Sequence, residues 1–458
     1  MAQRKTDRRN RQGEQTRTRL LEETMRLAAG HGYEGTKLSM VRRATGLSAS
    51  SIYWHFSDKD QLLAAALEHA FRVQSASTPN WLDSPARQPR REDLYEKLLA
   101  FPSTDSEMDY WRFGLQLVVV RPPEESPARA RFLDIRRQSV DWLGRWWERG
   151  FDEDMDQSRD AALLMGHFTV ALRDGAIIRD GALIRRHGQR PLDQRRVMWL
   201  LACCLDAAEI RLAELARTER LDRLPPAAPA QVDAGEGQGP REVFLRAAEE
   251  AVAEYGYGGV TVARVCEKAG LPPSSLYWSF KDKDELISTV VAGACRRWDA
   301  ARPPLAPRPE DGNWSRVLAV QLLRTMDNLA AESGVMRLGL LLLLQRAAVA
   351  EADRRNLEAV LQDMQAMTAQ WFRTVLSPAL ADDERAELAD YLAECLFILL
   401  EGLLLSRQIG ERQWDPELLA DLMGAALHGA ALQAEQDCAV PAGSGAAAGT
   451  AVPDGGAA

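Results

Sequence analysis

The chain repeats one string of residues after a long interval. Residues 46–62 read GLSASSIYWHFSDKDQL, and residues 270–286 read GLPPSSLYWSFKDKDEL. The two strings are identical at eleven of seventeen positions, including the rare Tyr-Trp pair. Because solenoid and propeller units repeat every few tens of residues, the much longer period of this repeat indicates two whole domains joined head to tail.

The size and composition of the chain suit two folded halves. Its 458 residues exceed the size at which a single hydrophobic core stops growing. Since 46% of them are hydrophobic, they can build two or more packed domains. The longest aliphatic run, residues 340–344, is far shorter than a bilayer span, and the N-terminal residues include no apolar signal stretch. We therefore expect a soluble, cytoplasmic protein with no membrane partner. The six cysteines lack CxxC or Cys/His ligand spacing, which predicts reduced thiols with neither disulfides nor zinc. We also expect no cofactor.

The charge of the chain is unevenly distributed. Its net charge is -9, but residues 1–224 hold 37 Lys and Arg against 33 Asp and Glu, whereas residues 225–458 hold 20 against 33. Residues 1–19 alone contain seven basic and two acidic side chains. Basic N-terminal arms often bind nucleic acid, and a solvated tail is the alternative interpretation. Over residues 1–15 we expect a disordered basic arm.

Apart from short turns, the chain reads as helix throughout. Leu, Ala, Arg and Glu dominate, apolar residues recur at spacings of three and four, and the alternation typical of strands is absent. Residues 224–240, LPPAAPAQVDAGEGQGP, predict a flexible linker, and residues 439–458 predict a disordered tail. The predicted fold class is all-α.

The first copy contains the outline of a helix-turn-helix. An amphipathic helix over residues 17–31 ends at a glycine, and a short helix over residues 36–45, with Thr36 as its N-cap, leads into a tight turn. Ser48 can cap a third helix, in which Ile52 and the phenylalanine four residues later point inward. In such a motif the helix after the turn enters the major groove of DNA.

The side chains that this third helix would display suit contact with DNA. Small residues at its start let the backbone approach base edges, and Tyr53 and His55 add hydrogen-bond donors at the rim. Lys59, at the start of the next helix, combines its charge with free backbone N–H groups and could hold a phosphate. Core packing is the alternative role for the aromatic residues. We accept it for the phenylalanines but expect the Tyr-Trp pairs to face outward, because their neighbours already supply the buried face.

Both copies resemble the DNA-binding domain of the TetR family of transcriptional repressors. The resemblance runs from Gly32 to Lys59 in the first copy and from Gly256 to Lys283 in the second, with the turn glycine, the aromatic positions and their spacing in agreement. From the motif and the resemblance, the expected DNA-contacting residues are Thr36, Lys37, Ser48, Ala49, Ser50, Ser51, Tyr53, Trp54, His55 and Lys59 in the first copy, and Thr261, Ser274, Ser275, Tyr277, Trp278 and Lys283 in the second.

The resemblance also implies a plan for the rest of each half. Members of that family consist of a DNA-binding head followed by a larger helical domain that binds a small molecule and dimerises. This implies heads over residues 16–72 and 241–298, and ligand-binding, dimerising domains over residues 73–223 and 299–438. Because family members read two half-sites as two-fold dimers, one fused chain can supply both heads. We expect an intramolecular pseudo-dimer whose last helices, around residues 197–215 and 418–432, pack as a four-helix seam, with a further homodimer as an open alternative.

The domains behind the heads contain clusters of aromatic and Met residues that could line an apolar effector pocket. Plain core packing is the alternative for each, because large residues on a helix face are usually buried. The expected pocket residues are Trp111, Phe113, Trp142, Trp146, Met165 and Phe168 in the first half, and Met336, Met367, Trp371 and Phe397 in the second. Arg112 and Arg337, at matching positions beside these clusters, could pair with an anionic group or form salt bridges.

The two heads are not equal. Ser48-Ala49 becomes Pro272-Pro273, and His55 becomes Ser279. Residues 1–72 carry 13 basic and 8 acidic side chains, whereas residues 241–298 carry 8 of each. Since neutralising phosphates supplies much of the affinity for DNA, we expect the first head to bind more strongly.

The sequence therefore indicates a ligand-responsive transcriptional regulator. The preferred interpretation is a repressor that binds a pseudo-palindromic operator in double-stranded DNA and is released by a small-molecule effector. The alternative is an interaction or sensor protein of the same fold in which at least the second head no longer binds DNA. The sequence has no phosphate-binding Gly loop, nucleophile elbow or paired-carboxylate motif, so we do not expect an enzyme.

Overall fold

The structure is a computed structural model. It describes residues 2–77, 81–83, 90–100, 105–120, 126–151, 157–179, 192–218, 223–224, 239–300, 307–331, 333–345, 351–409 and 413–439, and every structural statement below concerns these residues.

Each half of the chain builds the same series of helices. The first half contains α1 (Ala2–Gly35), α2 (Leu38–Thr45), α3 (Ala49–His55), α4 (Lys59–Ser77), the 3₁₀ turn η1 (Trp81–Asp83), α5 (Arg90–Leu99), α6 (Asp105–Val119), α7 (Pro127–Glu148), α8 (Ser158–Arg179) and α9 (Gln194–Thr218). The second half contains α10 (Pro240–Tyr255), the 3₁₀ turn η2 (Tyr257–Gly259), α11 (Val262–Ala269), α12 (Pro273–Ser279), α13 (Lys283–Ala300), α14 (Ser315–Ala331), α15 (Ser333–Leu344), α16 (Glu351–Val375), α17 (Asp382–Ile409) and α18 (Pro416–Ala439). Two two-residue strands, β1 (Arg223–Leu224) and β2 (Gln413–Trp414), pair antiparallel. The all-α prediction is confirmed.

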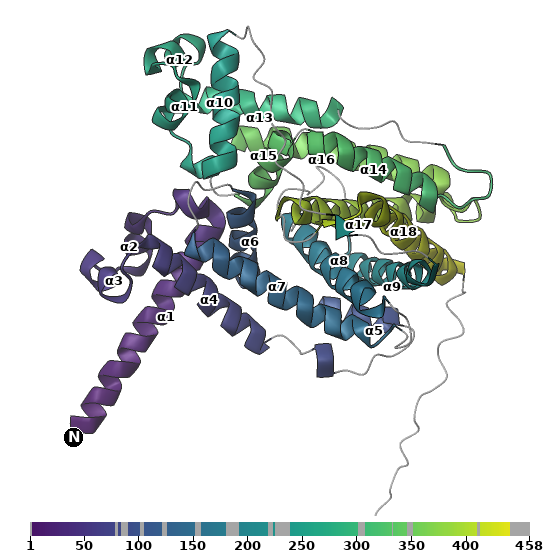
Figure 1. Cartoon of the computed structure of the whole chain (residues 1–458), viewed down its shortest axis with the longest axis horizontal. Coiled ribbons are helices and arrows are strands. Elements are labelled where there is room, and N and C mark those ends of the chain that lie inside the picture. The colour runs from purple at the N-terminus through teal and green to yellow at the C-terminus, as the bar shows by residue number, and fades with distance from the viewer. Residues whose placement is uncertain are drawn as a thin grey trace, which may run out of the picture.

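The two halves lie side by side, with both heads at one end of the molecule (Figure 1). Helix α8 of the first half packs on α17 of the second, and α9 packs on α18. We call these four helices the seam. It contains the predicted contact between the last helices of the two halves and adds the preceding helix of each.

Two glycines let the seam helices approach closely. A Cβ atom on Gly175 of α8 would lie 1.7 Å from the carbonyl oxygen of Ile398, and a Cβ atom on Gly402 of α17 would lie 1.7 Å from that of Ala171. Each glycine is four residues beyond the carbonyl that the other approaches, so the crossing of α8 and α17 is two-fold symmetric. Backbone contact of this kind requires glycine on both helices.

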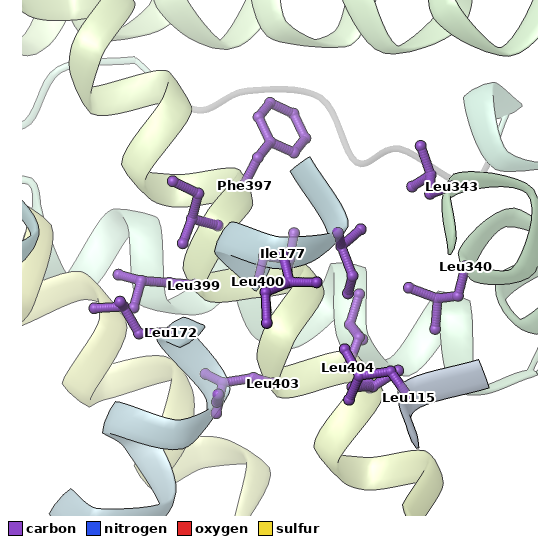
Figure 2. Close-up of a cluster of buried hydrophobic side chains, with 14 of the residues drawn as sticks. Leu115, Leu172, Ile177, Leu340, Leu343, Phe397, Leu399, Leu400, Leu403 and Leu404 are labelled. Carbon is purple, nitrogen blue, oxygen red and sulfur yellow. The ribbon is translucent and has the colours of Figure 1, made fainter. Parts of the chain in front are cut away.

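An apolar cluster shared by the two halves surrounds this crossing. Figure 2 shows Leu115 of α6, Leu172 and Ile177 of α8, Leu340 and Leu343 of α15, and Phe397, Leu399, Leu400, Leu403 and Leu404 of α17. By length and composition α8 could also cross a membrane, but 78% of its most apolar window is buried inside the protein. The apolar face of α8 is therefore core.

The N-terminal segment differs from its prediction. Helix α1 begins at Ala2, so the expected disorder of residues 1–15 is wrong for the backbone from residue 2 onward. Arg, Gln, Glu and Lys are good helix formers, and the segment extends a helix already held by packing on α4 and α6, so no new nucleus is needed. Most of the predicted linker (225–238) and nearly all of the predicted tail (440–458) lie outside the described residues.

Candidate nucleic-acid interface

The turn of the first head has the predicted geometry. Gly46 ends α2 with φ 70°, a left-handed conformation that favours glycine. Ser48 caps α3, because its Oγ accepts a hydrogen bond from the backbone N–H of Ser51 at 3.1 Å. The cap satisfies one of the free N–H groups at the start of the helix and fixes its direction.

Helix α3 buries one side and presents the other to solvent. Ile52 is 2% exposed and Phe56, just after the helix, is 6% exposed, and both join the core of the head. Tyr53 and Trp54 are 55% and 81% exposed. The rings of Trp54 and His55 meet edge to face, 4.7 Å between centroids. The Tyr-Trp pair faces outward as predicted.

The second head repeats this arrangement. Gly270 ends α11 with φ 64°, and Leu276 and the phenylalanine four residues later are buried. Tyr277 is 56% exposed and Trp278 is 91% exposed. One detail differs: Pro272 stands at the N-cap of α12 and makes no side-chain capping bond.

One predicted contact, Thr36, is occupied inside the head. Thr36 is buried, its Oγ1 donates to the carbonyl oxygen of Gly32 at 2.7 Å, and Lys37 takes the N-cap position of α2. The N-cap prediction for Thr36 is wrong because its hydroxyl is used within the preceding turn, and its burial argues against contact with DNA. Its counterpart Thr261 does cap α11, accepting from the backbone N–H of Arg264 at 3.3 Å, and is exposed.

Lys59 and Lys283 also point partly inward. The Nζ of Lys59 donates to the carbonyl oxygen of Tyr33 at 2.9 Å and lies 4.2 Å from the centre of the Tyr33 ring. Burial lowers the pKa of Lys59, although Glu34 and a further carboxylate raise it. The Nζ of Lys283 lies 3.4 Å from the carbonyl oxygen of Val260. Both lysines therefore tie the fourth helix to the turn after the first.

The remaining predicted residues are exposed or half-buried in each head. Lys37, Ser48, Ser50 and Ser51 are exposed and Ala49 and His55 half-buried in the first head, while Ser274 is exposed and Ser275 half-buried in the second. These side chains could reach a nucleic acid without any change in the fold of either head.

The two heads touch each other where their turns meet. Arg264 of α11 lies 3.6 Å from the carboxylate of Glu34, and α1 packs on η2. The side-chain amide of Gln345 lies between the two turns: a Cβ atom on Gly32 would be 2.5 Å from its Nε2, and one on Gly256 2.6 Å. Gly32 has φ 73° and Gly256 has φ 72°, and such left-handed values also favour glycine in both turns.

Glutamines connect the heads to the helices behind them. The Nε2 of Gln116, on α6, donates to the carbonyl oxygens of Ala29 and Leu344 at 2.5 and 3.1 Å. The Oε1 of Gln345, just after α15, accepts from the backbone N–H of Tyr257 at 2.8 Å. A shift of α6 or α15 would therefore reach the heads directly.

The predicted pocket residues are mostly core. Met367 is 49% exposed on α16, and Trp142 is half-buried against Trp81. The others are almost fully buried: Trp111, Phe113, Trp146, Met165, Phe168, Met336, Trp371 and Phe397. The two arginines beside them bond to protein groups, since Arg112 lies 3.5 Å from Asp109 and Arg337 donates to Gln408 at 3.0 Å.

The described parts of the chain include two cavities. One of about 30 Å³, room for about one water molecule, lies at the seam between Arg136, His167, Phe168, Ser406 and Arg407. A more open groove of about 380 Å³ is lined by Tyr95, Trp199, Arg195, Arg196 and Asp437, where α5, α9 and α18 meet. Among the predicted pocket residues, Phe168 lines the first of these cavities.

Sequence reasoning missed a polar network buried in the seam. Asp174 is fully buried and accepts hydrogen bonds from Trp111 Nε1 at 2.7 Å and from Arg136 Nη1 at 2.6 Å. Burial raises the pKa of Asp174, although Arg136 beside it lowers that pKa. Arg179 makes a second set of bonds, with Glu401, Glu394 and Gln365 of the second half. The carboxylates within the apolar stretches of α8 and α17 could have indicated this network, because a charge that becomes buried needs a partner.

Comparison with known proteins identifies both heads. The family model described as bacterial regulatory proteins, tetR family, matches residues 20–66 and 244–290. The HTH-type transcriptional repressor AcnR of Corynebacterium efficiens is 41% identical over 68 residues, which are 15% of this chain and 36% of that protein. The HTH-type transcriptional regulator AcrR of Shigella flexneri is 34% identical over 57 residues, 12% of this chain and 26% of that protein.

The chain thus spans only about a third or less of the length of these relatives. The two model matches coincide with α1 to α4 and with α10 to α13, the helices of the two heads. The family is one of regulators, which also agrees with the prediction that the chain is not an enzyme. The chain thus carries two regions of the kind that the tetR family model describes, one in each head.

Proposed function

We propose that the chain is a transcriptional repressor that reads a pseudo-palindromic operator with two non-identical heads and leaves it when a small-molecule effector binds. The observation that carries the proposal is the matched pair of helices α3 and α12, each of which follows a left-handed glycine and exposes a Tyr-Trp pair. Large exposed aromatic pairs favour an outside partner, and hydroxyl, indole and imidazole groups suit phosphates and base edges.

The arrangement of the heads supports the use of both. They lie at the same end of the molecule and meet at their turns, so one chain offers two reading helices related by an approximate two-fold axis (Figure 1). A two-fold protein on DNA favours an operator of two half-sites. Because the heads differ in sequence, we propose that the two half-sites also differ.

The N-terminal extension of α1 supports unequal binding. Residues 2–12 include five basic residues and one acidic one, and this part of α1 extends away from the body on the side of the first head (Figure 1). Among the described residues the second half has no counterpart, since α10 begins at Pro240, which aligns with residue 16 at the offset of the repeat. We propose that this extension follows the DNA backbone beside the first half-site, in the cytoplasm where the operator lies.

The effector would act through the helices behind the heads. We propose that it enters the aromatic cluster around Trp111 and Phe113 and displaces α6. Gln116 on that helix holds the backbone of α1, so a displaced α6 would tilt the first head. The effector itself would be apolar or aromatic, in keeping with the side chains of the cluster.

Selection of bound DNA with the purified full-length protein, followed by footprinting, tests the proposal. We expect two unequal half-sites, with firmer protection on the side of the first head. Trp54→Ala and Trp278→Ala should each weaken binding by about tenfold or more. Ile210→Ala, which removes an exposed apolar side chain on α9, is the control and should bind as the wild type does. Wild-type affinity in both Trp variants would contradict the proposal.

A second candidate is a chain in which only the first head binds DNA. The uncapped proline start of α12 and the balanced charge of the second head favour it. The same experiment decides between the two. A single protected half-site, lost in Trp54→Ala and unchanged in Trp278→Ala, would support this second candidate.

A further inference from the structure

The symmetric crossing of α8 and α17 pairs each seam residue of one half with a counterpart in the other. Ala171 and Gly175 correspond to Ile398 and Gly402. Both pairs are 227 residues apart. At this offset, Asp174 corresponds to Glu401, His167 to Glu394, and Arg179 to Ser406. The two sides of one interface can therefore be compared residue by residue.

On one side of the axis, the first half inserts an arginine into the second. The Nε of Arg179 lies 2.9 Å from Glu394 and its Nη1 2.9 Å from Glu401, while its Nη2 donates to Gln365 at 3.1 Å. Its guanidinium also lies 4.9 Å from the centre of the Phe397 ring. Arg179 is 5% exposed and Glu401 3% exposed, so the second half's carboxylates receive their counter-ion from the first half.

On the other side of the axis, the first half neutralises its own carboxylate. Arg136 on α7 donates to Asp174 at 2.6 Å and, through Nη2, to the Oγ of Ser406 at 2.8 Å. Where the second half would need the equivalent of Arg136 it has Leu361, given the offset of 225 that relates the Trp146-Trp147 and Trp371-Phe372 pairs. The second half therefore lacks an internal partner for Glu401 at this position.

A second ion pair across the seam also places its arginine on the first half and its carboxylate on the second. Arg211 of α9 lies 2.8 Å from Asp421 of α18, although both are about one-third exposed and contribute little. Arg407, next to Ser406, has Asp327 of its own half as its electrostatic partner. A pair of reversed polarity, Glu34 with Arg264, belongs to the heads rather than to the seam and is also about one-third exposed.

Pairing of identical halves would leave these charges unbalanced. In a pair of second halves, the buried Glu401 and the partly buried Glu394 would face Ser406 on each side and would lose their guanidinium. In a pair of first halves, Arg179 would face His167 and an Asp174 that Arg136 already neutralises. Unpaired buried charges are strongly unfavourable, so only a first half with a second half balances the seam.

We propose that the seam selects unlike halves: the surface of α8, ending in Arg179, fits the second half of this chain and rejects a second copy of the first. The selection follows from three differences between corresponding positions: Arg179 against Ser406, His167 against Glu394, and Arg136 against Leu361. It makes the fused chain a monomeric pseudo-dimer. It also ensures that every assembled unit carries one head of each kind, whatever those heads bind.

The test uses the full chain with a protease site placed between residues 225 and 238 and cut after folding. Light scattering of the uncut protein should give a mass near 50.9 kDa. Native mass spectrometry of cut protein, mixed with a mass-tagged copy and allowed to exchange, should show only first-second pairs. Pairs of identical halves in statistical proportion would overturn the proposal.

Two variants separate selection from mere stability. Arg179→Ser should weaken association of the cut halves by about a hundredfold or more, whereas Arg211→Gln, the partly exposed control, should change it only a few-fold. The triple variant Arg179→Met, Glu394→Leu, Glu401→Met replaces the cluster by apolar side chains and should still associate, but now also as second-second pairs. Unchanged pairing in this triple variant would show that the charges do not select the partner.

Discussion

The first and second heads have the same backbone but differ in the groups that would meet DNA. Gly46 and Gly270 end the second helix with φ 70° and 64°, and the Tyr-Trp pairs are exposed to similar extents. Ser48 caps α3 whereas Pro272 leaves α12 without a side-chain cap, and in the described chain the basic helical extension belongs to the first head. The backbone thus tolerates the loss of a cap, because the buried side chains at Ile52 and Leu276 hold both helices in place.

The two sides of the seam show the same kind of difference in their charges. Their backbones cross symmetrically, yet the first half carries its own arginine beside Asp174 while the second half takes Arg179 from its neighbour. In both regions, one scaffold has kept its packing while its polar groups diverged. A fused chain permits this, because its two copies are never required to pair with themselves.

The largest expected effect tests the symmetry of the crossing. Gly175→Ala places a Cβ atom 1.7 Å from a carbonyl oxygen of the facing helix, and Gly402→Ala does the same in reverse. We expect each to reduce the free energy of unfolding by about 3 kcal/mol, the upper end of the usual cost of overpacking, measured by chemical denaturation. Gly13→Ala, where nothing lies within 4 Å, is the control and should not destabilise. Unequal losses at Gly175 and Gly402 would break the two-fold comparison.

The next effect compares the seam carboxylates by their dependence on pH. Burial raises the pKa of Glu401 to about 7, although Arg179 lowers it. Since the folded pKa exceeds the unfolded one, the folded protein keeps a proton that the unfolded chain releases between about pH 4.5 and 7. This contribution to stability is full at low pH and is lost as the pH rises through about 7, above which Glu401 is ionised and pairs with Arg179 as a carboxylate.

Glu401→Gln removes the titrating group and isolates this effect. The difference in unfolding free energy between wild type and variant should change by up to about 1.4 kcal/mol per pH unit inside that window, in the direction that favours the wild type at low pH. Denaturation curves at several pH values between 5 and 8 measure it. A difference that stays constant with pH would mean that Arg179 keeps Glu401 ionised throughout.

A smaller effect sharpens the comparison of the heads. Deletion of residues 2–12 should weaken DNA binding and reduce the dependence of log affinity on log salt by about 0.9 for each phosphate that the protein no longer neutralises. Titrations at several salt concentrations measure both quantities. Replacing the five basic residues of this segment with Gln, which keeps a helix-forming residue at each position, should have the same effect if charge alone matters. An unchanged salt slope would remove the extension from the proposed interface.

The smallest effect concerns the caps. Ser48→Ala should lower the stability of the first head by about 1 kcal/mol, because the N–H of Ser51 loses its acceptor. Pro272→Ser should raise the stability of the second head by a similar amount, since Ser275 occupies the position of Ser51. Hydrogen exchange of the amides in α3 and α12 reports each head separately. Equal exchange before and after either change would show that packing alone holds these helices.

Much of the head could be predicted from sequence because its constraints are local. A turn needs a glycine with positive φ at residue 46, a helix start needs an acceptor such as Ser48, and helical spacing decides which side of α3 is apolar. The same reasoning failed at Thr36, whose hydroxyl bonds to the preceding turn. It also failed for residues 2–15, where the choice between a tail and a helix depends on the neighbouring helix.

The pocket and the seam depend on contacts between segments far apart in the chain. The sequence showed which residues are large and apolar, but whether Trp111 lines a cavity or fills a core depends on the helices packed around it. By itself, the sequence determined the duplication, the all-helical class and the two heads, since these follow from short-range patterns. Only the tertiary structure decided that Arg179 neutralises the other half's Glu401, because the energy of a buried charge depends on whatever side chain folding brings beside it.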